Sequence, residues 1–388
     1  MDQKRVFASS CSSHPLATQA VGEAVGALLE TLNGERPDLV VWFVTSHHVG
    51  AIEDIHSALQ SLLNPRAVIA ATSVSAIGGE TEIENSPGLS IFAAVLPDNQ
   101  LHAMRLDAVE TLDGLEVTGW SDETDDAHTL LLLADPFTFP VDLALRSAEA
   151  RYPALLIAGG NASSGSRPGS RPGSNRLVLN NDILSSGAVA IAVSGGERIR
   201  TVVSQGCRPL GVPFTVTASD GQFVESLGGK TALERLRGVA AEADESDREL
   251  LRDGVHLGVA IEESNDVLGR GDFLIRTVIG GDRATGAIAI GAHVEVGTTA
   301  QFQVRDAASA LEDLGVLLEG EEAGGVLMFT CNGRGSRFFS RPNQDAEAVQ
   351  TAIGPLALAG MACAGEIGPI AGQNHLHGFT ASLALFPR

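Results

Sequence analysis

The chain has few cysteines and few basic residues. Its 388 residues include four cysteines, Cys11, Cys207, Cys331 and Cys363, which lie far apart without a CxxC pair. This spacing indicates neither a disulfide framework nor a zinc ribbon, so we expect reduced thiols. The 26 basic residues face 48 acidic ones, and the net charge of -22 would repel phosphate backbones and anionic lipids. We therefore expect no nucleic-acid or membrane partner, although an acidic composition also serves solubility alone.

Long apolar runs are missing as well. The N-terminus, MDQKRVFASS, has no apolar stretch of signal-peptide length. The apolar runs LVVWFV and TLLLLA are far shorter than the roughly 18 residues that a membrane span needs. The sequence thus predicts a cytoplasmic protein.

Familiar catalytic and cofactor signatures are not found. There is no GxSxG elbow, and no GxGxxG follows a strand. Gly229-Lys230-Thr231 resembles the end of a phosphate-binding loop, but Val224 occupies the position where that motif requires glycine. A glycine turn before a helix explains the tripeptide, and we predict no cofactor.

What the sequence does contain is one frame repeated three times: an apolar strand, a helix, a second strand ending in a loop of small residues, and a third apolar strand. The strands are expected at 39–45, 67–71 and 88–96, at 129–134, 154–158 and 187–193, and at 325–330, 355–360 and 378–386. Helices at 52–63, 141–150 and 345–353 connect the first two strands of each copy, so those strands should be parallel. The stretch SGSRPGSRPGS (164–174) lengthens the middle copy and is expected to be an exposed loop.

A different region separates the second and third copies. A helix at 231–241 precedes four apolar strands at 255–261, 272–279, 286–294 and 298–304, with a hairpin signal at Gly280-Gly281-Asp282. The predicted fold class is α/β (α+β): repeated β-α-β-β units forming mixed sheets with an additional antiparallel β meander. We expect two domains, residues 1–215 with the first two copies and residues 216–388 with the meander and the third copy.

The third copy carries the densest group of polar and glycine residues. One loop, 331–337, follows its first strand, and another, 364–368, follows its second. Because the carboxyl ends of parallel strands form the usual ligand-binding edge, we expect a pocket where these loops meet residues 374–377. The predicted ligand-binding residues are Cys331, Asn332, Gly333, Arg334, Gly335, Gly365, Glu366, Asn374 and His377.

Within this set, Arg334 is expected to bind an anionic group through its planar guanidinium. Glu366 would be either its partner or a ligand for an amine, and the alternative is a structural salt bridge between two loops. Cys331 offers a second chemistry, because a thiol beside an arginine could have a lowered pKa and act as a nucleophile. That role needs a base, which folding would have to supply from a distant histidine. Otherwise the thiol is simply packed, and we predict no catalytic residue.

Two histidine pairs raise the question of a metal site. His47 and His48 follow the first strand of the first copy, whereas His375 and His377 precede the last strand of the third. An HxH spacing in an extended segment places both rings on one face. No carboxylate or cysteine lies at a matching local spacing, so we predict no metal site.

These motifs resemble the FIST family. FTCNGRG (329–335), CAGEIGP (363–369), Asn374 and Thr380 are similar to its C-terminal half. A serine-rich opening at 9–13, LVVWFVTS and VIAATSVSAIGG are similar to its first domain, although that domain usually has glycines where VIAATS stands. The resemblance implies an intracellular signal-transduction protein that senses a small ligand, for instance an amino acid or another small carboxylate, and acts through a protein partner. An enzyme with Cys331 as thiol nucleophile is the alternative.

Overall fold

The computed structural model describes residues 4–112, 114–165, 171–263 and 268–388. The chain forms two compact units. The first comprises Met1–Val203, Leu314–Leu376 and Thr380–Arg388, and the second comprises Ser204–Asp313 and His377–Phe379. Of the predicted exposed loop at 164–174, residues 171–173 are exposed, whereas Ser164 and Gly165 are buried, contrary to the prediction; residues 166–170 lie outside the described residues.

The first unit contains the three repeated copies. Copy 1 consists of β2 (Leu39–Thr45), α2 (Ile52–Leu63), β3 (Ala67–Ser73), β4 (Ser75–Gly78), β5 (Thr81–Glu84) and β6 (Leu89–Val95). Copy 2 consists of β9 (Ala127–Ala134), α3 (Val141–Arg151), β10 (Leu156–Asn161), β11 (Leu177–Leu179), β12 (Asp182–Leu184) and β13 (Ala188–Gly195). Copy 3 consists of β23 (Gly325–Cys331), α7 (Gln344–Ile353), β24 (Ala357–Cys363), β25 (Glu366–Ile370), β26 (Gln373–His377) and β27 (Thr380–Phe386).

Further elements flank the copies. They are β1 (Val6–Ser12), α1 (Ala17–Leu32), the short 3-10 helices η1 (Ser46–Ala51) and η2 (Asp122–Thr124), β7 (Asn99–Thr111), β8 (Gly114–Thr118), β14 (Arg200–Gln205) and α6 (Ala307–Leu318).

The three copies have the same strand order. The sheets contain the successions β1-β6-β2-β3, β7-β13-β9-β10 and β14-β27-β23-β24. In each copy the first and second strands are parallel, and the third strand runs antiparallel to the first. The predicted class of repeated β-α-β-β units in mixed sheets is confirmed.

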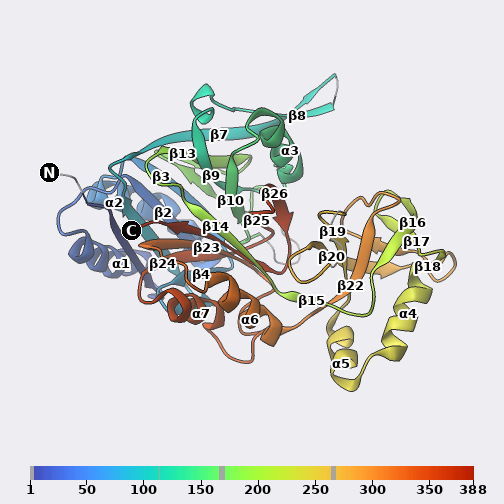
Figure 1. Cartoon of the computed structure of the whole chain (residues 1–388). Helices are drawn as coiled ribbons and strands as arrows, with labels where there is room; N and C mark the ends of the chain where they lie inside the picture. Colours follow the sequence, from blue (N-terminus) through green and yellow to red (C-terminus); the bar gives the residue numbers. More distant parts are fainter. Residues whose placement is uncertain (1–3, 113, 166–170, 264–267) are drawn as a thin grey trace. The chain divides into compact units, whose positions relative to one another are not determined.

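Each copy also lends a hairpin to the sheet of another copy. Hairpin β4–β5 of copy 1 extends the sheet of copy 3 next to β24, and β11–β12 of copy 2 extends the sheet of copy 1 next to β3. Hairpin β25–β26 of copy 3 extends the sheet of copy 2 next to β10 (Figure 1). The exchange is cyclic, so segments far apart in sequence become neighbouring strands.

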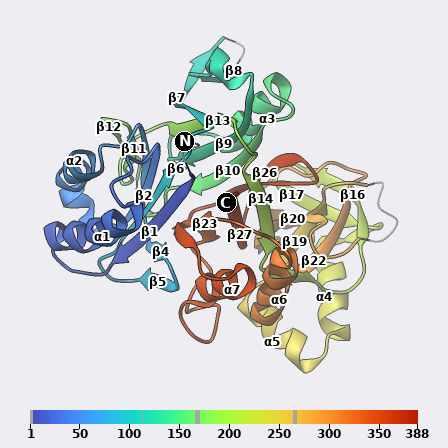
Figure 2. The ribbon, with the colours of Figure 1, turned by 60° about the vertical axis from the view of Figure 1, so that its left-hand side comes forward.

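Both faces of these sheets are covered, which explains their almost continuous apolar strands. Alternate residues of β2 belong to different cores: Val40 and Trp42 pack with α1 and α2, whereas Val41 and Phe43 join a central core that all three copies share. Figure 2 shows α1 and α2 against the first sheet, and α3 and α7 pack on the second and third. The copies therefore form one body around a common centre.

The second unit is a closed antiparallel sheet with two helices. Its elements are β15 (Cys207–Pro209), β16 (Phe214–Asp220), β17 (Phe223–Leu227), β18 (Lys230–Thr231), α4 (Ala232–Glu242), α5 (Glu245–Asp253), β19 (His256–Ala260), β20 (Phe273–Gly281), β21 (Ile288–Ile290) and β22 (Thr299–Arg305). The sheet runs β22-β16-β17-β21-β20-β19 and closes because β19 also pairs with β22. The predicted meander is confirmed, including the β20–β21 hairpin.

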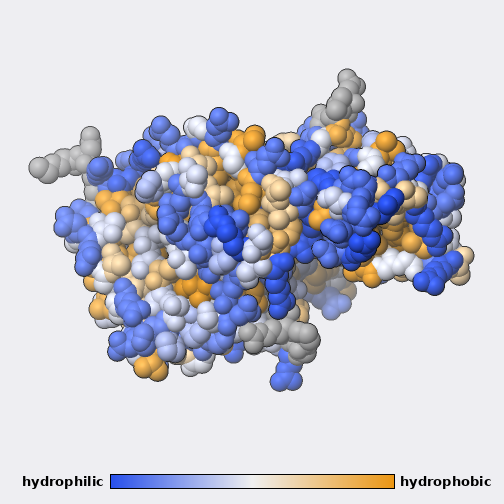
Figure 3. All heavy atoms as spheres, turned by 90° about the horizontal axis from the view of Figure 1, so that it is seen from below, coloured by the Kyte–Doolittle hydropathy of each residue, from blue (hydrophilic) through white to orange (hydrophobic). Residues whose placement is uncertain are grey.

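On the molecular face drawn in Figure 3, hydrophilic residues predominate and hydrophobic residues form only small groups. Among the residues that the structure describes, no helix combines the length and the hydrophobicity that a membrane span requires.

Candidate functional site

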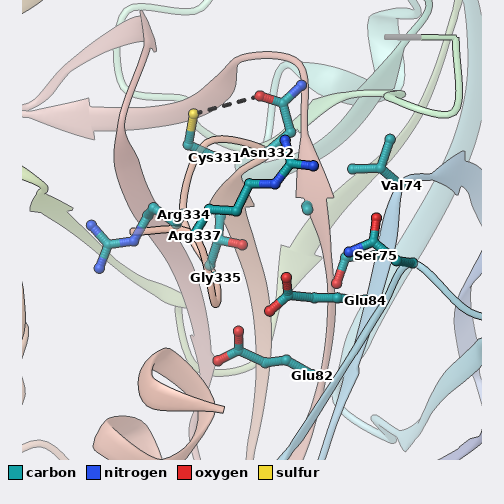
Figure 4. A pocket seen from close by; sticks show the side chains of 12 residues that line it. Val74, Ser75, Glu82, Glu84, Cys331, Asn332, Arg334, Gly335 and Arg337 are labelled. Atoms are coloured by element: carbon teal, nitrogen blue, oxygen red, sulfur yellow. Dashed lines mark hydrogen bonds between the residues drawn. The ribbon is translucent and has the colours of Figure 1, made fainter. Parts of the chain in front are cut away.

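A cavity of about 390 Å³ lies in the first unit, where hairpin β4–β5 of copy 1 meets the loop after β23 of copy 3. Its lining combines acidic, basic, amide, hydroxyl and thiol groups: Val74, Ser75, Glu82, Glu84, Asn85, Thr330, Cys331, Asn332, Arg334, Gly335, Arg337 and Ala362. Figure 4 shows the two glutamates pointing from β5 toward the loop that carries Cys331 and both arginines.

The glutamates fasten the hairpin to copy 3. Glu84 Oε1 accepts a hydrogen bond from the backbone N–H of Ser336, and Oε2 accepts one from its hydroxyl, both at 2.8 Å. Glu82 Oε1 accepts from the backbone N–H groups of Asp345 (2.9 Å) and Ala346 (3.0 Å). These N–H groups belong to the first turn of α7 and have no partner within the helix, so Glu82 caps that helix.

Gly335 permits the close approach of the loop to β5. Its φ of +84° lies in the left-handed region, and a Cβ atom there would lie 2.7 Å from Glu84 Oε1. Only glycine satisfies both conditions without strain.

Arg334 is paired inside the protein. Its Nε and one terminal nitrogen donate to the two carboxylate oxygens of Asp345 at 2.8 and 2.5 Å, and both side chains are only 1% exposed. Asp345 of α7 is thus its bidentate partner, and the charge of Glu366 also acts on the guanidinium. Because a bidentate pair occupies the flat edge of the guanidinium, Arg334 primarily fixes the loop against α7.

Glu366 lies at the start of β25 and is fully buried. Its Oε2 accepts hydrogen bonds from the backbone N–H (3.0 Å) and the hydroxyl (2.8 Å) of Thr380. Burial raises the pKa of Glu366 to about 8, although the bonds from Thr380 and the charge of Arg334 oppose the shift. Glu366 is therefore largely protonated near neutral pH.

Cys331 ends β23 and borders the cavity while remaining only 8% exposed. The backbone N–H of Gly333 points at its sulfur from 3.4 Å, and the sulfur lies 3.9 Å from Asn332 Oδ1 (Figure 4). Cys331 is the strand partner of Cys363, and burial raises the pKa of the Cys363 thiol.

The structure brings together only part of the predicted set. Cys331, Asn332, Arg334 and Gly335 line the cavity, whereas Gly365, Glu366 and Asn374 do not. Asn374 instead bonds the backbone of Leu155 and Ile157 and so holds β26 to copy 2. His377 is grouped with the second unit. The wall expected from 364–368 and 374–377 is supplied by hairpin β4–β5.

The histidine loop of copy 1 lies elsewhere. His48 is buried in η1, with its Nε2 3.1 Å from the carbonyl oxygen of His14. Burial lowers the pKa of His48, so the ring favours its neutral form. Within the described ranges, no three His, Cys, Asp or Glu side chains are grouped closely enough to hold a metal ion.

Sequence reasoning missed Ser75, Glu82 and Glu84, and it included Arg337 only as the end of the loop 331–337. The alternation in Thr81-Glu82-Ile83-Glu84 was the available signal, since it places both carboxylates on one face of a strand with Ile83 on the buried face. What the sequence could not show is that this strand adds to the sheet of copy 3.

Models of known protein families match most of the chain. The family model described as FIST N domain matches residues 38–230, and that described as FIST C domain matches residues 232–369. The uncharacterized protein Rv0628c of Mycobacterium tuberculosis (strain ATCC 25618 / H37Rv) is 41% identical over 97% of this chain and 98% of its own length. The uncharacterized protein Mb0898c of Mycobacterium bovis is 39% identical, covering 98% of each chain.

Among solved structures, cyanuic acid hydrolase from A. caulinodans aligns over 99% of this chain and 100% of its own. The sequence identity is 12% and the TM-score is 0.31.

Proposed function

This chain belongs to the FIST family, and on that premise we propose that it is a signal-transduction protein that senses a small ligand in the cavity between hairpin β4–β5 and the loop 331–337. The single observation that carries the proposal is the cavity itself. It is lined from both matched regions, by Glu82 and Glu84 from the FIST N match and by residues of the loop 331–337, among them Cys331 and Arg337, from the FIST C match. A ligand there would contact both.

The ligand that suits this lining is an amino acid or another small carboxylate. The volume of about 390 Å³ falls within the roughly 300 to 1,000 Å³ of small-molecule sites. We assign direct contact to Cys331, Asn332 and Gly335, and a supporting role to Gly333 and Arg334. Gly365, Glu366 and Asn374, which do not line the cavity, would support the fold around it, and we assign no role at this cavity to His377, which is grouped with the second unit. We further propose a cytoplasmic sensor with a protein partner downstream.

A thermal-shift screen against L-amino acids and small carboxylates tests this function. A ligand that binds only the folded state stabilises it by about 2.7 kcal/mol at one hundred times its Kd. Ser75→Trp, which should fill the cavity, must abolish the shift that a binding compound produces. The proposal fails if no compound of the panel raises the melting temperature of the wild-type protein.

The thiol-enzyme alternative has less support from the geometry. A cysteine nucleophile needs a base within hydrogen-bond reach. Among the described residues that line the cavity there is no histidine. The thiol of Cys331 interacts with the amide of Asn332, the backbone N–H of Gly333 and the carboxyl group of Glu366, and burial raises the pKa of Glu366 to about 8, so that this carboxyl group is largely protonated near neutral pH. Rapid, pH-dependent labelling of Cys331 by iodoacetamide near neutral pH would favour the enzyme over the sensor.

A further inference from the structure

Of the two arginines at the cavity, only one is available to a ligand. Arg334 is committed to Asp345, with both side chains 1% exposed. Arg337 lines the same cavity and is exposed, and no described residue forms an ion pair or hydrogen bond with its side chain. The cationic group that can exchange water for a ligand anion is therefore Arg337.

The wall of the cavity formed by β5 likewise has one carboxylate oxygen that is available to a ligand. Both oxygens of Glu84 accept from Ser336. Glu82 uses Oε1 for the two N–H groups of α7, while no described residue donates to its Oε2. Figure 4 shows the carboxylate of Glu82 across the cavity from the loop that carries Arg337. The cavity thus has an anionic side and a cationic side.

We propose that Arg337 and Glu82 are the two residues that recognise the ligand, Arg337 binding its anionic group and Glu82 its cationic group, and that the ligand cation displaces a proton from Glu82. This inference rests on the proposed function, and it narrows the ligand to a zwitterion. It also moves anion recognition from Arg334 to Arg337.

The proton displacement follows from the surroundings of Glu82. Burial, reinforced by the charge of Asp345, raises the pKa of Glu82 to about 7. The charged groups around it are Asp345 from α7, Glu84 from its own strand, and Arg334 and Arg337 from the loop. An ammonium group beside Glu82 favours the ionised carboxylate, so binding at pH 7 should release roughly half a proton. Release should approach zero at pH 8.5, where Glu82 is already ionised.

The experiment is calorimetric titration at pH 7 and pH 8.5 in two buffers of different ionisation enthalpy. The probe is the L-amino acid that gives the largest thermal shift, together with its N-acetyl and carboxamide derivatives. Arg337→Gln should weaken binding of the amino acid at least tenfold, whereas the charge-matched control Arg283→Gln, at an exposed position in the second unit, should leave it unchanged. Both derivatives should bind at least tenfold more weakly than the parent.

Glu82→Gln provides the test of proton release. Glutamine keeps a carbonyl oxygen for the two N–H groups of α7, so the cap can persist while the titrating group is lost; a thermal melt checks that the variant is folded. Wild-type protein should release protons at pH 7, and the variant should release none. Three outcomes would overturn the inference while leaving the sensor function intact. They are equal affinity of Arg337→Gln and Arg283→Gln for the amino acid, undiminished binding of the N-acetyl derivative, and no proton release by the wild-type protein. Absence of any binding amino acid or carboxylate would overturn both.

Discussion

Replacing Glu366 by glutamine should stabilise the protein, and increasingly so as the pH rises. Glu366 is fully buried and accepts two hydrogen bonds from Thr380, which a glutamine carbonyl can also accept. Burial raises the pKa of Glu366 to about 8, against 4.5 for an unperturbed glutamate. Between these values the folded state holds a proton that the unfolded state has released, so the wild-type protein loses stability as pH rises.

The magnitude follows from the two pKa values of Glu366. One pKa unit corresponds to about 1.4 kcal/mol, so the penalty on the folded state approaches about 5 kcal/mol above pH 8 and is below about 1 kcal/mol at pH 5. The advantage of Glu366→Gln should therefore grow by roughly 4 kcal/mol from pH 5 to pH 9.

The assay is urea unfolding at pH 5, 7 and 9, with the exposed Glu30→Gln as control. Glu30→Gln should follow the wild-type pH dependence. If Glu366→Gln also follows it, then Glu366 is ionised in the folded protein and the reasoning from burial is refuted.

Three further predictions concern stability. Arg334→Lys keeps the charge but cannot keep the bidentate contact with Asp345, and it should cost about 1 to 3 kcal/mol in urea unfolding; an unchanged midpoint would show that the second hydrogen bond is dispensable. Burial lowers the pKa of His256 to about 4, so stability should fall as pH drops from about 6.5 toward 4, by up to about 3 kcal/mol, and His256→Gln should remove this dependence in melts at pH 7 and pH 4.5. Gly335→Ala should lower the melting temperature, at a cost of about 1 kcal/mol, because alanine is strained at a φ of +84°; a wild-type melting temperature would contradict this.

Much of the fold was predictable because its signals are local. The apolar run LVVWFVT is β2 from end to end, and the helix predicted at 52–63 ends there, with Asn64 after it in the left-handed conformation. Helix α5 was missed, because its charged sequence has no buried residue to set an apolar period.

Only one wall of the candidate site, the loop 331–337, could be predicted from the sequence. The loop 331–337 stood out because glycines and charges follow a buried strand directly. Its partners did not, since Glu82 lies about 250 residues away and reaches the loop only through the exchange of hairpins. Glu366 seemed the natural partner of Arg334 because both follow neighbouring strands. The guanidinium is in fact held in a bidentate pair by Asp345 on the next helix, and Glu366, which is also buried, acts on it through its charge.

The cyclic exchange of hairpins has a consequence for how the chain is closed. Copy 2 completes the sheet of copy 1 and copy 3 completes that of copy 2, but only copy 1, the earliest in sequence, can complete copy 3, the last. A fragment lacking the third copy would leave β10 and hairpin β4–β5 with unpaired edges, which are templates for aggregation. The cavity lies at this one junction, so a bound molecule would stabilise the contact that turns a linear series of copies into a ring.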